Sequence, residues 1–529
     1  MSEPASERTL PRMVAAAVER YGSRPAIEDG ESVQSYAELG EAAERASRAF
    51  IASGVEPGDR VAIWAPNIAE WVVAAIGLQS AGAVLVPIST RYKGAEAEHV
   101  LSRSRAKLLC TVSGFLATDY AAMLAGRELP HLERIVMLRG EGVGADAWPD
   151  FLASGEAVPA GEARDRAQSI EPDHLLDMLF TSGTTGKPKG VMTAHGQNLA
   201  VFETWSAGVG LREGDRYLVV APFFHSFGYK AGWLAAIMRG ATILPEAVFD
   251  ADAVVARIEA ERINVLPGPP TIYQALLAAP GRAEADLSSL RLAVTGAAAI
   301  PVELVQRMRD ELGFETVLTA YGLTEACGTV SMCQPGDDAE TIANTSGRPI
   351  PGVEVRVVDP KGGELPRGEP GEIWVRGYNV MHGYFDAPEQ TREAVDAEGW
   401  LRTGDIGVMD ERGYLRITDR LKDMFIAGGF NCYPAEIENL MFSHHEIAQV
   451  AVIGVPDERL GEVGMAFVVP EAGCSPDLEA LRLWCREQMA NFKVPRRIEI
   501  VDALPLNAAG KVDKLSLRAR AAEGASATR

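Results

Sequence analysis

The segment LFTSGTTGKPKGV, residues 179–191, decides how the rest of the chain is interpreted. It gathers hydroxyl, glycine and lysine residues into one short loop: Thr181, Ser182, Gly183, Thr184, Thr185, Gly186, Lys187, Lys189 and Gly190. Backbone N–H groups, hydroxyls and ammonium groups together suit an anionic phosphate chain, and glycines let the backbone approach it without a Cβ clash. Because residues 178–180 are apolar, the pattern predicts a phosphate-binding loop at the end of a buried strand.

The same loop has a plainer interpretation as a flexible surface turn, which its Gly, Ser and Thr content alone would favour. Two lysines within the turn and the apolar strand before it favour phosphate binding instead. The loop is not a Walker A motif, which needs Gly, four residues and then Gly-Lys-Ser/Thr. Here Pro188 follows Gly186 and Lys187, and Thr181 stands where the first glycine should be.

Length and charge limit the classes of function. A chain of 529 residues is too long for a single core, so we expect two or more domains. Its 47% hydrophobic and 23% charged residues are typical of a globular protein. The net charge of -22 argues against nucleic acid or an anionic membrane as a partner. An acidic protein still binds a nucleotide where basic side chains and N–H groups converge locally.

Cysteine usage and the first residues of the chain predict a cytoplasmic location. The cysteines are sparse and show no C-x-x-C spacing: Cys110, Cys327, Cys333, Cys432, Cys474 and Cys485. We therefore expect free thiols in a reducing compartment. Residues 1–13 include acids and lack the apolar core of a signal peptide. The apolar stretch 71–88 contains Gln79, Ser80 and glycines, so it predicts a helix and a strand, not a membrane span.

Apolar runs alternate with helical stretches through most of the chain. Residues 60–89 predict one β-α-β unit, and further strands are expected at 216–222, 241–245, 264–268, 290–296 and 316–322. Helices are expected between them, for example at 252–261 and 302–312. The pattern predicts an α/β fold whose large N-terminal domain consists of parallel, helix-covered sheets. Short strands over 347–417 predict a small β subdomain, and 423–529 predict a small α+β domain.

Several predicted strands end in residues that suit a ligand, because ligands of a parallel sheet bind at the carboxyl ends of its strands. His225 follows one strand, and small residues that could admit an adenine ring follow another: Gly296, Ala297 and Ala298. Further strand ends and turns contribute Tyr321, Gly322, Thr324, Glu325 and Asp405. Alone, such a histidine is more often packed or exposed, and such an aspartate is more often a turn former.

Together with the loop, these motifs resemble the adenylate-forming superfamily over almost the whole chain. That superfamily includes acyl-CoA synthetases, adenylation domains of peptide synthetases and beetle luciferases. The resemblance implies that a carboxylate attacks the α-phosphorus of ATP to give an acyl-adenylate and pyrophosphate, after which a thiol expels AMP. Because both reactants of the first step are anionic, catalysis would consist mainly of positioning and charge neutralisation.

The resemblance also implies roles for individual residues. Those implied to be catalytic are Lys511, Thr181, His225 and Glu325, and Glu325 would also hold Mg²⁺. Those implied to bind ATP or CoA are Thr181, Ser182, Gly183, Thr184, Thr185, Gly186, Lys189, Gly296, Ala297, Ala298, Tyr321, Gly322, Thr324, Asp405, Arg420, Gly428, Gly429, Phe430 and Lys511. The implied acid pocket comprises His225, Phe227, Gly228, Trp233, Gly322 and Ala326.

The same resemblance implies a mobile C-terminal domain. Residues 1–421 would bind the nucleotide and the acid, and residues 422–529 would rotate about a hinge at Lys422. Lys511 would serve the first reaction, and the loop at Gly428 and Gly429 would line the path of CoA in the second. One departure from the pattern is Leu506, where a basic residue commonly follows the proline.

The acceptor of the acyl group separates three hypotheses. An acyl-CoA ligase uses ATP, CoA and Mg²⁺ and needs no partner protein. A peptide-synthetase adenylation domain would be followed by a carrier domain and would hold an aspartate in its pocket, which segment 226–234 lacks. A nucleotide-binding regulator would leave Lys511 and Glu325 without a purpose. The sequence favours the ligase, and a homodimer is an expectation that it leaves open.

Four runs resemble, more narrowly, the CoA ligases that activate HIP, a bicyclic indane propanoate left from steroid rings C and D. They are APFFHSFGYKAGW, VLPGPPTIYQALL, LTAYGLTEA and LKDMFIAGGFNCYPAEIE. Ser226 departs from that pattern, and Cys327 lies in the expected pocket wall. Another alicyclic acid, or a medium- or long-chain fatty acid, therefore remains the alternative substrate.

Overall fold

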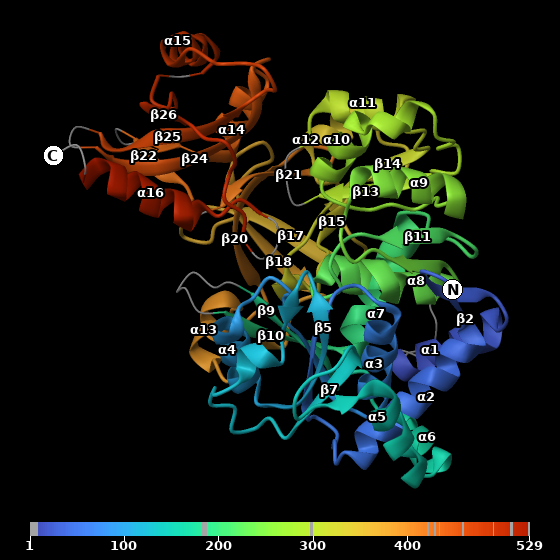
Figure 1. Ribbon diagram of the computed structural model, residues 1–529. Coiled ribbons are helices and arrows are strands. Elements are labelled where there is room, and N and C mark those ends of the chain that lie inside the picture. Colours follow the sequence, from blue (N-terminus) through green and yellow to red (C-terminus); the bar gives the residue numbers. More distant parts are fainter. Residues whose placement is uncertain are drawn as a thin grey trace. The chain divides into compact units, whose positions relative to one another are not determined.

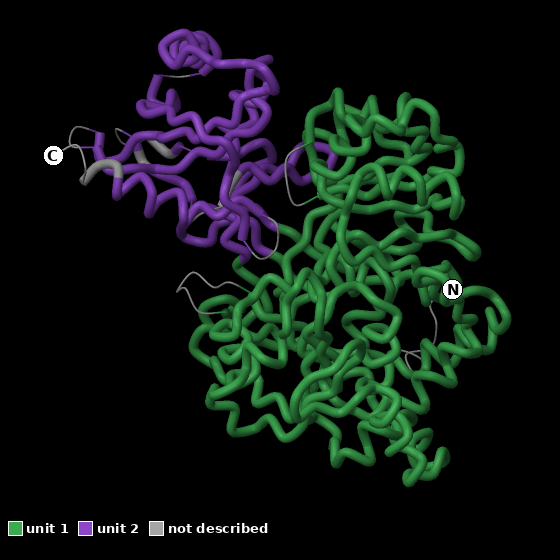
Figure 2. The backbone as a smooth tube through the Cα atoms, in the orientation of Figure 1, with its two compact units in different colours: residues 1–355, 375–402 green, residues 356–374, 403–529 purple. Residues whose placement is uncertain are grey.

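The computed structural model describes residues 9–181, 188–296, 300–420, 423–427, 430–432, 434–457, 460–489, 491–507 and 511–526. The chain divides into two compact units, which Figure 2 colours separately. The first unit comprises Met1–Val355 and Val375–Arg402, and the second comprises Arg356–Trp374 and Thr403–Arg529. The predicted hinge, Lys422, lies outside the described residues, so the domain boundary expected there stays a prediction.

A large mixed sheet forms the core of the first unit. Its strands lie in the order β19 (Gly383–Tyr384), β10 (Lys189–Ala194), β9 (Leu175–Thr181), β4 (Val84–Pro87), β3 (Arg60–Trp64), β5 (Ala106–Phe115), β7 (Arg134–Arg139) and β8 (Asp146–Ala147), and β6 (Thr118–Asp119) pairs with β5. The pairs from β9 through β4, β3, β5 and β7 to β8 are parallel, whereas β9 and β10 form an antiparallel hairpin. The predicted β-α-β unit at 60–89 is confirmed as β3, α3 and β4.

Two further groups of strands complete the first unit. One has the order β11 (Arg216–Val219), β12 (Thr242–Pro245), β1 (Pro25–Asp29) and β2 (Ser32–Ser35), and the other β13 (Leu292–Gly296), β14 (Thr316–Tyr321), β15 (Ser331–Met332) and β16 (Arg348–Pro349). The strand predicted at 264–268 is reduced to isolated bridges from Val265 to Tyr217 and Leu292. Pro267 lacks the backbone N–H that a longer ladder would need.

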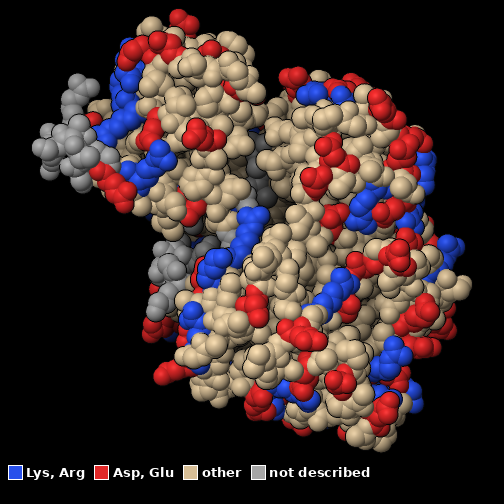
Figure 3. Space-filling model, viewed as in Figure 1, with Lys and Arg blue, Asp and Glu red and all other residues tan. Residues whose placement is uncertain are grey.

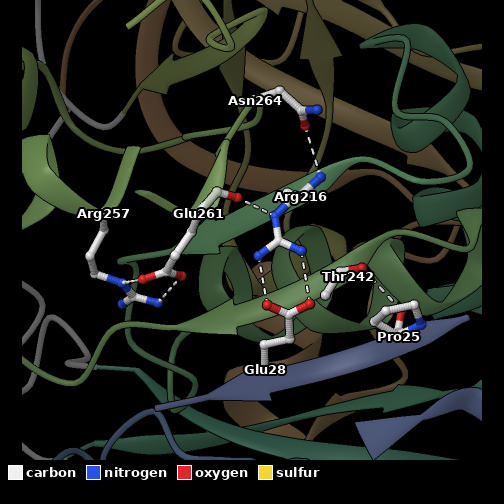
Figure 4. A network of polar contacts seen from close by, with 7 residues as sticks. All are labelled: Pro25, Glu28, Arg216, Thr242, Arg257, Glu261 and Asn264. Carbon is white, nitrogen blue, oxygen red and sulfur yellow. Dashed lines mark hydrogen bonds and ion pairs between the residues drawn. The ribbon is translucent and has the colours of Figure 1, made fainter. Parts of the chain in front are cut away.

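A polar network joins three chain segments at the edge of this region (Figure 4). The guanidinium of Arg216 donates to both carboxylate oxygens of Glu28, at 2.8 and 2.6 Å, and to the carbonyl of Glu261. Arg257 in turn donates to both oxygens of the Glu261 side chain, and Asn264 Oδ1 accepts from the Arg216 N–H. Bidentate guanidinium–carboxylate pairs fix both distance and orientation. The network therefore fixes β1, β11 and the end of α9 (Ala251–Glu261) relative to one another.

Helices of the first unit pack around these sheets, as Figure 1 shows. They are α1 (Leu10–Tyr21), α2 (Tyr36–Ala52), α3 (Ala69–Ser80), α4 (Gly94–Ser104), α5 (Trp148–Ser154), α6 (Ala160–Gln168), α7 (His195–Gly208), α8 (Ala235–Arg239), α9 (Ala251–Glu261), α10 (Pro270–Ala278), α11 (Val302–Asp310), α12 (Ala339–Asn344) and α13 (Pro388–Ala394). Local sequence explains where they begin: α2 starts with a capping box in which the Glu38 N–H donates to Ser35 Oγ and the Ser35 N–H donates to Glu38.

Two further sheets lie wholly or largely in the second unit. One sheet has the order β17 (Val353–Val358), β18 (Gly371–Gly377), β20 (Leu401–Met409) and β21 (Leu415–Arg420), and the other β23 (Phe430–Cys432), β22 (Phe425–Ala427), β25 (Gly461–Pro470) and β24 (Ile447–Asp457), with β26 (Arg497–Ile500) beside β25. The helices of the second unit are α14 (Pro434–Phe442), α15 (Leu478–Gln488) and α16 (Lys514–Ser526). Ile437, Val452 and Leu481 belong to one buried apolar cluster between them.

The predicted fold class is confirmed: an α/β chain with a large N-terminal part and a small α+β C-terminal part. Acidic and basic side chains are interspersed over the face drawn in Figure 3, and red acidic residues are prominent there. Among the helices that the structure describes, none combines the length and the apolar character that crossing a bilayer requires.

Candidate functional site

The predicted phosphate loop connects two strands of a hairpin in the first unit. β9 is buried along Leu176, Met178 and Leu179 because it lies inside the large sheet. The strand ends at Thr181, which lies directly opposite Lys189 at the start of β10. Residues 182–187, and with them Ser182, Gly183, Thr184, Thr185 and Gly186, lie outside the described residues. The hairpin therefore presents Thr181 and Lys189 at the two ends of the loop.

Glu325 lies beside this hairpin end. It belongs to the short 3-10 helix η6 (Thr324–Ala326), and its Oε1 accepts hydrogen bonds from Thr181 Oγ1 at 3.3 Å and from the hydroxyl of Tyr384 at 3.0 Å. Tyr384 is held by pairing of β19 with β10, and the ammonium of Lys189 lies 4.8 Å from the centre of its ring. Burial and the neighbouring Glu325 raise the pKa of Tyr384 above its ordinary value. Tyr384 thus links two predicted site residues, Lys189 and Glu325.

The resemblance implies a magnesium ion at Glu325, and the donors around this carboxylate fit one. Mg²⁺ prefers oxygen ligands and is usually bound through one or two carboxylates together with phosphate oxygens and water. Glu325 supplies the carboxylate, and the Thr181 hydroxyl lies 3.3 Å from it. Thr181 ends the strand that leads into the predicted phosphate loop, and Glu325 contacts it, so this donor set suits an ion shared with a phosphate chain.

The carboxyl ends of β13 and β14 lie next to each other, as the alternating pattern predicts. Gly296 pairs with Ala320 in parallel register, and Tyr321 ends β14. Gly322 follows, and a Cβ at this position would lie 2.0 Å from the carbonyl oxygen of Gly328. Only glycine permits that approach. Ala297 and Ala298 lie outside the described residues.

Three residues of the predicted acid pocket, Phe227, Gly228 and Trp233, lie in η4 (Phe227–Leu234), a π-helical segment that contains a kink at Gly232. His225 precedes it and accepts from the N–H of Phe227 through Nδ1 at 3.2 Å. A Cβ at Gly228 would lie 2.2 Å from the Ala221 carbonyl, so this glycine lets η4 pack directly on the preceding chain. Trp233 is buried and stacks on Tyr229, with ring centres 4.9 Å apart. π-Helical turns are frequent at functional sites.

Thr324 and Ala326 lie in η6 beside Glu325, and further predicted residues belong to the second unit. Asp405 lies in β20 opposite Arg420 of β21 and is 4% exposed. Its N–H donates to Thr403 Oγ1 at 3.1 Å. Lys511 is exposed, and its backbone N–H donates to Asn507 Oδ1 at 3.1 Å. Lys422, Gly428 and Gly429 lie outside the described residues, and so do the side chains of Arg420 and Phe430.

Sequence reasoning missed three residues. Tyr384 lies in a two-residue strand, which no periodic pattern reveals. Asp177 and Lys230 form a fully buried ion pair at 3.1 Å between β9 and η4. Each of them is a charge inside an otherwise apolar run, LLDMLF or FGYKAGWL, and that interruption was the available signal.

Two family models match the chain. The AMP-binding enzyme model matches residues 14–385, and the AMP-binding enzyme C-terminal domain model matches residues 436–511. The first covers well over half of the chain. The chain belongs to the AMP-binding enzyme family. This confirms the resemblance to the adenylate-forming superfamily that the motifs indicated.

Two similar members of the family are named 3-(7a-methyl-1,5-dioxo-octahydro-1H-inden-4-yl)propanoyl:CoA ligase. The protein of Rhodococcus jostii is 48% identical over 516 residues, which are 96% of this chain and 98% of the relative. The protein of Mycobacterium tuberculosis is 49% identical over 513 residues, which are 97% and 98% of the two chains. The narrower resemblance to HIP-activating ligases is confirmed by these relatives.

A solved member of the family has the same fold over the whole chain. The crystal structure of the anthranilate CoA ligase AuaEII in complex with anthranoyl-AMP gives a TM-score of 0.86 at 28% identity and covers 98% of both chains. That complex holds an acyl-adenylate, the intermediate expected of the family. The predicted enzyme class, an AMP-forming acyl-CoA synthetase that uses ATP and CoA, is therefore confirmed.

Proposed function

We propose that this acyl-CoA ligase activates an indane propanoate such as HIP. The observation that carries the proposal is the 48% and 49% identity, over 96% and 97% of the chain, to two ligases named for a bicyclic indane propanoate with two ring carbonyls. The geometry agrees with the chemistry of such a ligase, because Thr181, Lys189 and Glu325 converge where a phosphate chain would bind.

In the first half-reaction, the carboxylate of the acid attacks the α-phosphorus of ATP and pyrophosphate leaves. Both partners are negatively charged, so fixed donors and cations at the site lower the barrier. We assign phosphate binding to Thr181, residues 182–186, Lys189 and Thr324. The ammonium of Lys511 neutralises charge between the carboxylate and the α-phosphate in this step.

The nucleoside contacts follow from the strand ends. Tyr321 at the end of β14 stacks on adenine, with Gly296, Ala297, Ala298 and Gly322 leaving room for the ring. Asp405 accepts hydrogen bonds from both ribose hydroxyls, which a carboxylate can do at once, and Arg420 donates to the ribose or phosphate. The low exposure of Asp405, 4%, supports a role in which few waters compete for its carboxylate.

Mg²⁺ would be held by Glu325 together with phosphate oxygens, and when bound it neutralises charge on the phosphate chain. Tyr384 and Thr181 donate to Oε1 of Glu325 and thereby orient the carboxylate. In this assignment the two hydroxyls determine how the carboxylate faces the phosphate site.

The second half-reaction needs a different arrangement of the C-terminal domain. We propose that residues 422–529 rotate about Lys422 after the adenylate forms, so that Lys511 leaves the site. Gly428, Gly429 and Phe430 then line the path of CoA, whose thiol attacks the acyl carbonyl and expels AMP. The acid is enclosed in both steps by the predicted pocket residues His225, Phe227, Gly228, Trp233, Gly322 and Ala326.

A panel of carboxylic acids tests the proposal. With ATP, Mg²⁺ and CoA, we expect the indane propanoate to give a kcat/KM at least tenfold higher than acetate or palmitate. A ring that fills an apolar pocket gains about 0.8 kcal/mol per buried CH₂, so a few methylenes produce that ratio. Equal efficiency with straight chains of widely different length would contradict the proposed acid and favour a fatty acyl-CoA ligase instead.

The same assay tests the acceptor and the mechanism. AMP and pyrophosphate are the expected products, and ADP would contradict adenylation. A carrier protein bearing a phosphopantetheine arm, supplied in place of CoA, should be acylated far more slowly than CoA. A faster reaction with the carrier would favour a stand-alone adenylation enzyme.

Two expectations concern the protein in the cell. We propose a homodimer and a cytoplasmic location. The second rests on the cysteines, which are sparse and show no C-x-x-C spacing, as is typical of free thiols in a reducing compartment. Sedimentation equilibrium tests the first, and fractionation of cells tests the second.

A further inference from the structure

The most deeply buried charges in the first unit lie outside the residues to which we assigned a role. Asp177 of β9 and Lys230 of η4 are both 0% exposed. Three oxygens surround the ammonium of Lys230: Asp177 Oδ2 at 3.1 Å, Asp177 Oδ1 at 3.2 Å and Thr193 Oγ1 at 3.1 Å. Thr193 also donates to Asp177 Oδ1 at 2.6 Å. Burial raises the pKa of Asp177, and the ammonium and the hydroxyl oppose that rise.

Asp177 of the ion pair and Thr181, the last residue before the phosphate loop, lie on one face of the same hairpin. Alternate residues of a strand point to the same side, so Asp177, Leu179 and Thr181 lie on one face of β9. Asp177 is paired with Thr193 and Thr181 with Lys189 across the hairpin. The two pairs are four residue steps apart along the strand, which is about 13 Å at the usual rise. A shift of the hairpin at one end therefore moves the other.

The segments around the pair carry the predicted acid pocket and the carboxylate site. Lys230 lies within η4, between the predicted pocket residues Phe227 and Trp233. Cys327, two residues after Glu325, is fully buried, and the charges of Lys230 and Asp177 act on its thiol. Burial raises the pKa of its thiol to about 12, so it remains a neutral thiol beside the pair.

Helix α3 adds a further tie to η4. Gln79 Nε2 donates to the hydroxyl of Tyr229 at 2.9 Å and to the carbonyl of Leu176 at 3.1 Å. Tyr229 precedes Lys230 in η4, so these bonds hold the segment that carries the ion pair. Buried hydrogen bonds thus connect α3, the phosphate-loop hairpin and the pocket segment, and Cys327 brings the chain that carries Glu325 next to them.

We propose that Asp177 and Lys230 form a positioning pair for adenylation, which fixes the pocket segment η4 relative to the phosphate-loop hairpin. The inference rests on the proposed function, because it assumes that η4 encloses the acid. The pair acts through geometry: it sets the distance and direction between the bound carboxylate and the α-phosphorus. A misplacement of about 1 Å costs on the order of 10²-fold in rate.

An ion pair suits this purpose because it is directional. The ammonium has oxygens from two strands around it at 3.1–3.2 Å, so η4 has one favourable position against the hairpin. Apolar side chains of the same volume would fill the space and often preserve or raise stability. They would not specify the same register of the two segments.

The double variant Asp177→Leu/Lys230→Met separates positioning from stability. We expect its thermal midpoint to stay within a few degrees of that of the parent, because both charges are removed together. We expect kcat of ATP–pyrophosphate exchange to fall at least tenfold, while KM for ATP changes less than twofold. The acid is the one that the parent turns over fastest in the panel, so the test remains valid if the indane propanoate proves to be a poor substrate.

A second buried ion pair of the first unit supplies the matched control. Arg291 and Asp215 lie 2.6 Å apart with side chains 10% and 2% exposed, and neither belongs to the proposed site. The variant Asp215→Leu/Arg291→Met should keep the exchange kcat within twofold of the parent. An equal loss in both double variants would overturn the inference, and so would full activity of the Asp177→Leu/Lys230→Met protein.

Thr193→Val provides a second route if the double variant fails to fold. It keeps the ion pair and the side-chain shape but deletes the hydroxyl that contacts both charges. We expect a threefold to tenfold lower exchange kcat with little change in KM for ATP. Parental kcat in this variant would overturn the inference. No exchange by the parent with any acid would instead contradict the proposed function.

Discussion

The hydroxyl of Tyr384 donates to Oε1 of Glu325 across 3.0 Å, although 59 residues separate the two along the chain. The contact forms because β19 pairs with β10 of the phosphate-loop hairpin and Met381 N–H donates to the Glu325 carbonyl at 2.9 Å. The backbone and the side chain of Glu325 are thus both fixed by the segment 381–384. Its carboxylate is therefore oriented by groups of the protein itself.

Replacing Tyr384 by phenylalanine should weaken the use of Mg²⁺. The ring and its contact with Lys189 remain, but Glu325 loses one of its two hydroxyl donors. We expect the Mg²⁺ concentration for half-maximal adenylation to rise threefold to tenfold, measured by pyrophosphate exchange. Tyr378→Phe is the control, because the Tyr378 hydroxyl hydrogen-bonds Thr204, at 3.4 Å, and neither residue belongs to the proposed site. An unchanged Mg²⁺ dependence in Tyr384→Phe would contradict an orienting role.

Glu325→Gln removes the charge but keeps the size of the side chain. We expect exchange to fall about 10²-fold or more at physiological Mg²⁺, since a preorganised charge at the site contributes on that order. The fold should persist, because a carboxylate near the start of a short helix contributes under about 1 kcal/mol through the dipole. Circular dichroism and the thermal midpoint check the fold. Near-normal turnover at saturating Mg²⁺ would make Glu325 a structural residue.

Lys511→Ala should separate the two half-reactions. We expect adenylation to fall by roughly 10²–10³-fold, the size of one preorganised electrostatic contact. The same variant, given a presynthesised acyl-adenylate, should form the thioester at nearly the parental rate. Lys361→Ala, at an exposed lysine of the second unit, is the control and should leave both rates unchanged. Equal damage to both halves by Lys511→Ala would contradict a role confined to the first step.

Lys422→Pro tests the proposed hinge. Proline restricts φ at this position, so we expect adenylation to persist and thioester formation to slow at least tenfold. The two half-reactions are again measured separately. Parental rates in both would show that no backbone rotation at residue 422 is needed.

His195 should give stability a pH dependence that is independent of catalysis. It begins α7, is 1% exposed and accepts the Leu10 N–H through Nδ1 at 3.1 Å. Burial, followed by the nearby His174, lowers its pKa from 6.5 to about 3. The unfolded chain therefore binds this proton more readily, and the stability is complete above pH 6.5 and is lost as the pH falls toward 3.

The expected loss between pH 7.5 and pH 5 is about 2 kcal/mol of unfolding free energy. His195→Asn keeps an acceptor near the position of Nδ1 and should remove that part of the slope in urea unfolding measured at both pH values. His131→Asn, at an exposed position, should leave the slope unchanged. An undiminished slope in His195→Asn would contradict the assignment.

The strands and the ends of the site were predictable because they depend on local patterns. The run before Thr181 is apolar and the loop after it is rich in glycine, so strand and turn follow from burial and backbone freedom. Ala320 and Gly296 lie at adjacent strand ends because parallel strands share a carboxyl edge. The prediction of a full strand at 264–268 was wrong. The run is apolar, but Pro267 has no backbone N–H with which to extend the ladder.

Other parts of the site depend on contacts that no local pattern encodes. Tyr384 reaches Glu325 through a strand of two residues, too short for any periodicity. Lys230 stands in an apolar run that resembles an ordinary buried helix, and its partner Asp177 lies 53 positions away. Pairing of distant charges is decided by the packed interior, where an uncompensated charge is too costly to keep.

The complete burial of Asp177 and Lys230 also constrains how this chain can diverge. A substitution at either position alone strands a charge in the interior, at a cost of about 3–5 kcal/mol against a typical total stability of about 5–15 kcal/mol. Both endpoints, charged pair and apolar pair, are stable, but each single step between them is disfavoured. The two residues should therefore be conserved together or substituted together. We expect a relative in which both have been substituted to use a different carboxylic acid as its substrate.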